Sequence, residues 1–563
     1  MSKTHSELLR QGMQLCNTQK YAEALAIAEQ VVNEDPENFD AVHLLGVSHA
    51  ALGHIGVATV ALKQAVQIRP TVAESRKNLA NALKRMGKND QAIEQLELAV
   101  QHEPNNVDAA LALADMKAAV SKFDDAIEIC QRLVDQHPEH ALAHAKLGDV
   151  LLGGQKYGEA ADAYRRALRL QPNLRQAYSN LGAALVPLGH PDAAVDSYNQ
   201  ALAFGESAVG QNNLGLALLA DGRPAEAIVA FDRALALKPD YVDARWNRAL
   251  SKLKVGELDE GWRDYEYRWQ LRTLSGRAMP PQPLWMGKED LAGKSILLQC
   301  EQGLGDTIQF IRFAPKVALR GAKVVLQVQT PLVPLFRNLP GIDTVIAANE
   351  PAPQTDFFCP MLSLPLALGV RKESIPAEVP YVKAQPEIAE KWRRELPTGN
   401  RLKIGLVWSG NPAHRGDRFR TLSLEYLKPL LDRDSVDWVC LQKEIRKSDW
   451  PLVWELPALH LLGLRFANFE DTAAVMEGLD LVISADTSVA HLAGAMAKPL
   501  WIMLPLSSDF RWLTGTDRSP WYPTARLFRQ DKASDWPGVI EAVNEALTGF
   551  IAEHASGGRR AAE

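Results

Sequence analysis

The chain is poor in cysteine and has no long apolar segment. Its five cysteines fall mostly inside apolar stretches and none belongs to a CxxC pair, which favours buried thiols in a reducing compartment over a disulfide framework. No segment has the apolar length of a signal peptide or a membrane span, so we expect a cytoplasmic protein without a transmembrane segment. The formal net charge of −6 is spread over 563 residues, which argues against a nucleic-acid or membrane-surface binder.

A repeat with a period of about 34 residues fills the first half of the chain. Prolines recur at Pro36, Pro70, Pro104, Pro138, Pro172 and Pro239. Small residues keep the same step at Gly12, Gly46, Ala80, Ala114, Gly148, Gly182, Gly215 and Ala249, and again at Ala24, Ala58, Ala92, Ala126, Ala160, Ala194, Ala227 and Gly261. Small residues let two helices approach closely and a proline stops the second helix. The pattern resembles about eight tetratricopeptide repeats, which stack into an all-α superhelix with a concave binding face.

Asparagines recur on the first helix of the repeats, two positions before the small residue. They are Asn78, Asn180, Asn213 and Asn247. A side-chain amide both donates and accepts, so such a ladder can hold an extended peptide by its backbone. The alternative is that Asn is simply common at this position. We expect a protein or peptide, acceptor or partner, on this face, bound by Asn180, Asn213 and Asn247.

The second half alternates short apolar runs with helical stretches. The runs are "SILLQC", "KVVLQVQ", "DTVIAA" and "TDFFCP", then "LKIGLVW", "DWVCLQ", "LDLVIS" and "PLWIML". Runs that are apolar on both faces predict parallel strands covered by helices, here in two Rossmann-like lobes. We expect a repeat array at 1–270, a connector at 271–292, a first lobe at 293–395, a second lobe at 396–550 and a disordered tail at 551–563. The aromatic cluster Trp262, Tyr265, Tyr267 and Trp269 is expected to pack on the last repeat or the following domain.

Ligands of open α/β sheets bind beyond the carboxyl ends of the strands, so the loops that follow the runs are the candidate site. In "EQGLGD", Gly303 and Gly305 permit a tight turn and Asp306 begins a helix, where a plain N-cap would need no further role. In "SGNPAHRGDRFRTL", His414, Arg415, Arg418 and Arg420 suit phosphate oxygens, unless the loop is merely solvated.

The third loop, "SADTSVAHLAGAMAKP", joins a strand to a helix whose first amides face the expected cleft. Such a helix start binds a diphosphate without a metal. Candidate ligands are Asp486, Thr487, Ser488 and His491. Capping alone would also explain Asp486 and Thr487, and a place in the core would explain His491.

The motifs "GLGD" (303–306), "GLVWSGNP" (405–412) and "DTSVAHLAGAMAKP" (486–499) resemble those of the ADP-heptose lipopolysaccharide heptosyltransferases, glycosyltransferase family 9. The resemblance spans about 284–549 and implies an α/β B-type glycosyltransferase fold. It implies that Asp306 is the base that deprotonates the acceptor hydroxyl. It also implies that the second lobe binds a nucleotide-sugar donor, with Asp486, Thr487, Ser488 and His491 at the diphosphate.

The same resemblance suggests further donor contacts in the second lobe. Gln442 and Glu444 of "LQKE" are expected near the nucleotide, and Arg415, Arg418 or Arg420 replaces the family's cationic phosphate contact. Gly405 joins Gly303 and Gly305 as an expected loop glycine. No metal and no other cofactor is expected.

Three hypotheses follow for the function. The first is an inverting, metal-independent glycosyltransferase whose repeats present a protein acceptor, an architecture similar to the protein O-linked N-acetylglucosamine transferases. The second is a heptosyltransferase-like enzyme that modifies a cell-surface saccharide. The third is a repeat scaffold with an inactive transferase domain.

Overall fold

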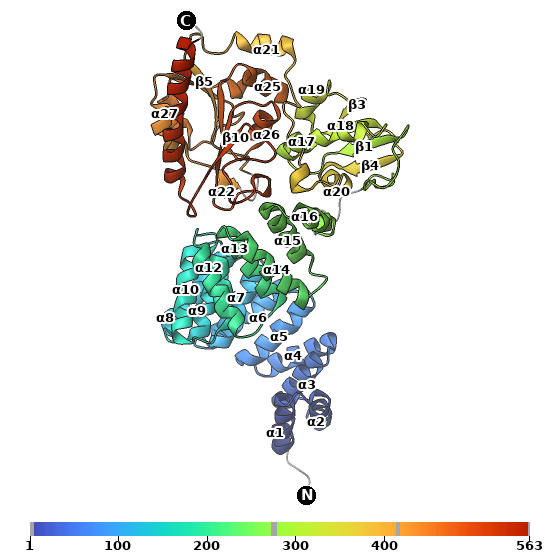
Figure 1. Cartoon of the computed structure of the whole chain (residues 1–563). Coiled ribbons are helices and arrows are strands. Elements are labelled where there is room, and N and C mark those ends of the chain that lie inside the picture. The colour runs from blue at the N-terminus through green and yellow to red at the C-terminus, as the bar shows by residue number, and fades with distance from the viewer. Residues whose placement is uncertain (1–4, 272–278, 413–416, 561–563) are drawn as a thin grey trace. The chain divides into compact units, whose positions relative to one another are not determined.

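The computed structural model describes residues 5–271, 279–412 and 417–560 (Figure 1). The chain divides into two compact units, Met1–Gly205 and Glu206–Glu563. Among the described helices, none combines the length and the apolar character that crossing a membrane requires.

The first unit is built from consecutive helix pairs. They are α1 (His5–Asn17), α2 (Tyr21–Glu34), α3 (Phe39–Ala51), α4 (Ile55–Ile68), α5 (Ala73–Arg85), α6 (Asn89–His102), α7 (Val107–Ala119), α8 (Phe123–Gln136), α9 (Ala141–Gly153), α10 (Tyr157–Leu170), α11 (Arg175–Leu185) and α12 (Pro191–Ala203). A Cβ on Gly148 would lie 2.6 Å from the Tyr164 ring, and one on Gly182 would lie 2.8 Å from the Tyr198 ring. The repeating small residues therefore permit close helix packing, as predicted.

The second unit begins with more helices of the same kind. They are α13 (Ala208–Ala220), α14 (Pro224–Leu237), α15 (Val242–Val255) and α16 (Leu258–Tyr265), followed by η1 (Glu266–Gln270). Trp262 is 1% exposed and packs edge-on against Phe310 and Phe510, with ring centroids 5.9 and 5.7 Å away. Tyr265 lies beside it. The expected packing of these two aromatics is confirmed, and the last repeat shares one hydrophobic core with the α/β region.

Two parallel sheets follow. The first has the order β3-β2-β1-β4, formed by β1 (Ser295–Gln299), β2 (Lys323–Val328), β3 (Thr344–Ala347) and β4 (Phe357–Pro360). The second has the order β10-β9-β8-β5-β6-β7, formed by β5 (Leu402–Val407), β6 (Val436–Cys440), β7 (Leu459–His460), β8 (Leu481–Ala485), β9 (Leu500–Leu504) and β10 (Ala525–Arg529). Each predicted run contains a strand, whereas β7 and β10 were not predicted.

The helices of the α/β region are mostly short. Those that follow strands of the first sheet are α17 (Leu304–Phe310), η2 (Ile311–Phe313), α18 (Ala314–Ala318), η3 (Thr330–Leu332), α19 (Val333–Phe336), η4 (Met361–Ser363), α20 (Leu364–Ala367), η5 (Lys372–Ser374) and α21 (Pro386–Arg393). Those that follow strands of the second are α22 (Asp417–Arg420), η6 (Leu424–Leu427), α23 (Lys428–Leu431), α24 (Trp450–Trp454), η7 (Leu462–Arg465), α25 (Phe469–Glu477), α26 (Ser488–Ala495), η8 (Phe510–Trp512) and α27 (Trp536–Arg560).

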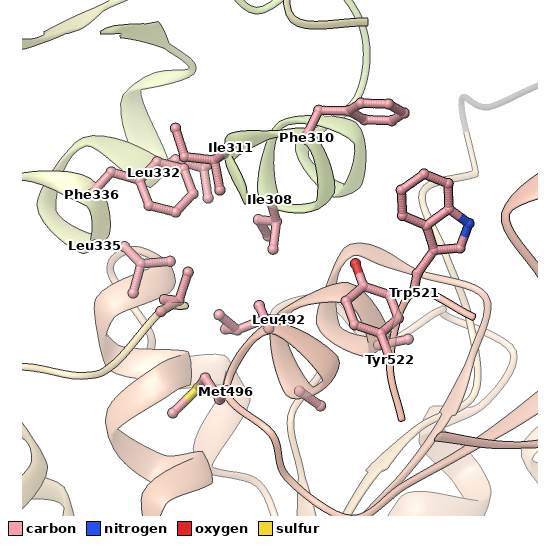
Figure 2. Packing of buried hydrophobic residues seen from close by; sticks show 14 of the residues in the cluster. Ile308, Phe310, Ile311, Leu332, Leu335, Phe336, Leu492, Met496, Trp521 and Tyr522 are labelled. Atoms are coloured by element: carbon pink, nitrogen blue, oxygen red, sulfur yellow. The ribbon is translucent and has the colours of Figure 1, made fainter. Parts of the chain in front are cut away.

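Helix α17 of the first lobe packs on α26 of the second, and α19 of the first lobe packs on α25. Figure 2 shows Ile308 of α17 facing Leu492 of α26, with Leu335 and Phe336 nearby, and all four side chains are buried. The contact brings the loops that carry the predicted motifs toward one another.

The structure differs from the predicted segment boundaries in three places. Helix α21, expected in the first lobe, packs on α25, and the Trp392 indole donates to Asp471 at 2.8 Å. Trp285, expected in a connector, is fully buried and its amide donates to the Phe358 carbonyl. Residues 551–560, expected to be disordered, continue helix α27.

Candidate active site

In each parallel sheet there is a switch point, where the order of the strands reverses. In the first sheet β1 lies between β2 and β4, and in the second β5 lies between β6 and β8. Ligands of such sheets bind in the crevice beyond the carboxyl ends of the strands at this switch point. The loop after β1 carries "GLGD", and those after β5 and β8 carry the other two motifs. The topology therefore places all three predicted loops at switch points.

Asp306 combines a structural contact with one to the other lobe. Its Oδ2 accepts the Gly303 amide at 2.7 Å, at the start of α17. Its Oδ1 accepts from the Arg511 guanidinium of the second lobe. Asp306 therefore does cap α17, as the alternative proposed. Capping does not explain why its other oxygen accepts from Arg511 of η8.

Gly305 permits the close contact between the lobes. A Cβ at this position would lie 2.7 Å from His491 Cδ2 and 3.4 Å from Ser488 Cα. Any larger residue would push α17 away from α26, where the third motif begins. The glycines of "GLGD" thus hold Asp306 next to the start of α26.

The third motif starts α26 without a side-chain cap. Thr487 occupies the N-cap position with an extended backbone, and its side chain makes no capping hydrogen bond. Its Oγ1 lies 3.2 Å from Ser484 Oγ. First-turn amides have no partner within their own helix, so those of Ser488 and Val489 remain suited to an anion. The capping alternative is not supported for Thr487.

His491 is 5% exposed. Its Nδ1 lies 3.0 Å from the Tyr522 hydroxyl, and its ring stacks on Trp512 at a centroid distance of 5.1 Å. Burial, with a smaller contribution from Arg511, lowers the pKa of His491 to about 3. The imidazole is therefore neutral at physiological pH, and these contacts fit the alternative of a core histidine.

Asp486 directly follows β8 and is partly exposed. Burial of the carboxyl, with a further contribution from Asp509, raises its pKa to about 6. Nearby Arg420 and Arg511 oppose this shift. A carboxyl with a perturbed pKa at a switch point is typical of a functional site.

Replacing Asp486 with Asn is expected to raise the free energy of unfolding by about 1 to 3 kcal/mol at pH 7.5 and by much less at pH 4. Because the folded-state pKa lies above the unfolded value, the unfolded chain ionises first as pH rises, and the wild type loses stability through that range. Urea unfolding at both pH values measures the difference. Asp480→Asn is the matched control, because Asp480 caps the opposite end of β8 and accepts the Lys403 amide at 2.8 Å. An equal effect of Asp486→Asn at both pH values would contradict the assignment.

The structure places the predicted phosphate-binding residues of the second loop in different surroundings. Arg420 Nη1 donates to the Asp486 backbone carbonyl at 3.0 Å, and its Nε forms an ion pair with Asp417 Oδ1 at 3.5 Å. Arg418 belongs to α22. His414 and Arg415 lie outside the described residues. Arg420 is thus the predicted arginine that the structure brings to the third motif.

Two other predicted donor residues and one predicted loop glycine occupy different environments. Gln442 Oε1 accepts the amides of Trp408 and Ser409 at 2.7 and 2.8 Å, so this amide group shapes the loop after β5. Glu444 is exposed. The interpretation of Gly405 as a loop glycine is wrong, because it lies inside β5, where a Cβ would come within 2.7 Å of the Leu441 and Leu479 side chains.

Two of the three predicted acceptor asparagines, Asn180 and Asn247, already have hydrogen-bond partners on the protein. In the first unit, Asn180 Nδ2 donates to Asp149 Oδ1 at 2.8 Å and Asn180 Oδ1 accepts from Gln176. In the second unit, Asn247 Nδ2 donates to Asn212 Oδ1 at 3.0 Å. Asn213 is partly exposed on α13. Peptide binding by these amides stays a prediction, and for Asn180 and Asn247 it requires exchange of an existing hydrogen bond.

The segment after β9, residues 505–515, is a part of the site that the sequence analysis missed. Arg511 joins Asp306 to Asp509, whose Oδ1 accepts from Arg511 Nη1 at 2.7 Å. Leu513 has φ of 50°, a left-handed conformation that bulky residues adopt mainly under functional constraint. The sequence did contain a signal for this segment. It directly follows the strand run "PLWIML", just as the third motif follows the run "LDLVIS".

The buried charges of the site interact strongly. Although burial works against its charge, Asp306 and Asp509 raise the pKa of Arg511 above its ordinary value. The guanidinium also lies over the Phe510 ring, 4.3 Å from its centroid. Among the residues that the structure describes, no group of three or more His, Cys, Asp or Glu side chains is placed to hold a metal ion.

Comparison with known proteins identifies the repeats. Four overlapping or adjacent segments, 77–141, 117–175, 145–209 and 208–241, match the tetratricopeptide repeat. Protein FlbA of Caulobacter vibrioides is 28% identical over 342 residues, which cover 56% of this chain and 56% of FlbA. The match thus spans little more than half the length of that relative.

Solved structures also match the chain in part. A tetratricopeptide repeat protein from Parabacteroides merdae is 13% identical, with a TM-score of 0.37, and covers 44% of this chain and 99% of its own. A chain of the APC/C hetero-tetramer Cut9–Hcn1 is 19% identical, with a TM-score of 0.35, and covers 44% of this chain and 52% of its own. On the family matches, residues 77–241 consist of tetratricopeptide repeats.

Proposed function

We propose that the protein is a metal-independent, inverting glycosyltransferase that moves a sugar from a nucleotide-sugar donor to an acceptor hydroxyl. One observation carries the proposal. Asp306 of the first lobe lies beside a group from the second lobe that suits an anion, made of Arg511, Arg420 and the first amides of α26. A base facing an anion site across two switch points is the arrangement that sugar transfer from a phosphate ester requires.

In the proposed reaction, the acceptor oxygen attacks the anomeric carbon as Asp306 takes the hydroxyl proton. The bond from the anomeric carbon to the donor phosphate oxygen breaks, and its electron pair leaves with the phosphate. Backbone amides and arginines stabilise that developing charge. The acceptor hydroxyl must compete with Arg511 for the Asp306 carboxylate, so donor binding that recruits Arg511 would free the base.

The repeats support a protein as the acceptor. Tetratricopeptide arrays present extended concave surfaces to protein partners. The last repeat shares a core with the α/β region, so a partner bound by α13 to α16 would lie on the same compact unit as the site. Transfer to a cell-surface saccharide, with the repeats binding a partner enzyme, is the competing substrate class.

Calorimetry with a panel of nucleoside mono- and diphosphates and their sugars tests the donor site. We expect one nucleotide to bind selectively, Arg420→Ala to weaken it at least about tenfold because a cation of the proposed anion group is lost, and Asp480→Ala, at the opposite end of β8, to leave it unchanged. Bound sugar should then be transferred with a chelator present, since no metal takes part in the mechanism. If no nucleotide binds, the transferase proposal fails and the repeat scaffold becomes the better interpretation.

A further inference from the structure

Lys254 reaches from the last repeat into the loop after β9. It lies at the end of α15, and its Nζ donates to Ser507 Oγ at 3.1 Å. The Lys254 carbonyl accepts the Thr514 amide at 3.1 Å. This loop also carries Asp509 and Arg511, so α15 contacts the segment that joins the two lobes at Asp306.

The Lys254 ammonium is buried without an acid. The residue is 8% exposed, and among the described residues no carboxylate lies within ion-pair distance of its Nζ. Lys252, two positions earlier on the same helix and 7% exposed, pairs with Glu260. Burial lowers the pKa of Lys254 to about 8, with Arg529 adding to the shift and Asp509 opposing it. A neutral side chain at this position could donate the same hydrogen bond to Ser507 without the free-energy cost of burying a charge.

Arg529 of β10 is a second cation of this kind. Its guanidinium donates to Ser508 Oγ and to the Trp512 carbonyl, both neutral acceptors. Burial lowers the pKa of Arg529 to about 10, although Asp486 opposes the shift. The Asp509 carboxylate, which acts on Lys254, forms its ion pair with Arg511. Lys254 and Arg529 thus both contact the loop after β9, and among the described residues neither has a carboxylate within ion-pair distance.

We infer that Lys254, supplied by the repeat region, binds a phosphate of the nucleotide donor, so that the repeats complete the donor site. The inference rests on the proposed function and deepens it. The ligand group is a phosphate, either alone or as part of the donor's diphosphate. It contacts the Lys254 ammonium beside the loop after β9. Asp509 and Arg529 both lie close enough to act on the Lys254 ammonium, and the bound anion supplies a negative partner for Lys254 and Arg529.

The test compares Lys254→Met and Lys254→Arg with Lys252→Met, using inorganic pyrophosphate and the nucleotide panel as probes. Calorimetry should show Lys254→Met weakening binding about tenfold to a hundredfold, while Lys254→Arg and Lys252→Met stay close to wild type. Mononucleotides, compared with nucleoside diphosphates and pyrophosphate, distinguish a site for a single phosphate from a site for a diphosphate.

Proton uptake provides a readout that misfolding cannot imitate. Near pH 8.5 part of the free Lys254 is neutral, and a bound anion favours its charged form. Binding to the wild type should therefore take up protons, measured in buffers of different ionisation enthalpy, whereas binding to Lys254→Arg should not. If nucleotides bind the wild type and Lys254→Met equally, the role of Lys254 is refuted while the transferase proposal stands. If they bind no variant and not the wild type, both fail.

Discussion

Asp306→Asn is expected to lower kcat about 10²- to 10⁴-fold, the usual contribution of a general base. An Asn oxygen can still accept the Gly303 amide that Asp306 now holds at 2.7 Å, so α17 keeps its first turn. The variant lacks the basic oxygen that takes the acceptor proton and also loses the charge opposite Arg511. Donor binding should persist, because the proposed phosphate contacts lie on the second lobe and on Lys254 of α15, and none is on the first lobe.

Asp356→Asn is the matched control for the base. Asp356 accepts the Ser295 amide at 2.8 Å, at the amino end of the first sheet and therefore away from the switch point. Transfer rates and nucleotide affinity are measured for both variants, together with thermal unfolding. Normal turnover by a correctly folded Asp306→Asn variant would exclude Asp306 as the base.

Arg268→Ala is expected to reduce the free energy of unfolding by about 3 to 5 kcal/mol, the cost of breaking a buried ion pair by removing one partner. Arg268 is fully buried and donates to both oxygens of Glu301, at 2.9 and 3.0 Å. It also donates to Glu266 and Ser363. Its removal leaves the buried Glu301 carboxylate without its guanidinium.

Urea unfolding of the whole chain, monitored by tryptophan fluorescence, measures this loss. Arg263→Ala is the control, because its pair with Asp259 is exposed and such pairs contribute only about 0 to 1 kcal/mol. The transition of the second unit should shift in Arg268→Ala and hardly move in Arg263→Ala. Equal effects of the two substitutions would mean that the buried network does not stabilise this unit.

The sequence allowed the helices, the small-residue packing and most strands to be predicted, because these follow from local periodicity. Gly148 against Tyr164 is one such case: the 34-residue step marks the position, and the close contact explains it. The strands β7 and β10 were missed because β7 has only two residues and two of the five residues of β10 are arginines.

The site was predictable in its loops but not in its pairings. The rule that ligands bind at strand ends located Asp306 and Asp486. No local pattern indicates that Arg511 meets Asp306, 205 positions away, or that Lys254 leaves its repeat to contact Ser507. Gly405 was misread for a related reason, since a glycine needed for packing inside a strand looks the same as one needed for a turn.

The common core of the last repeat and the α/β region has a consequence for how such proteins diversify. Trp262 and Tyr265 lie in the same core as Phe310 and Phe510, so a graft that replaced everything before residue 271 would have to rebuild that interior. A graft ending at Gly205 would leave the second compact unit whole. Recombination can therefore exchange recognition modules upstream of Glu206, while α15 and α16 are inherited together with the α/β region that they help to complete.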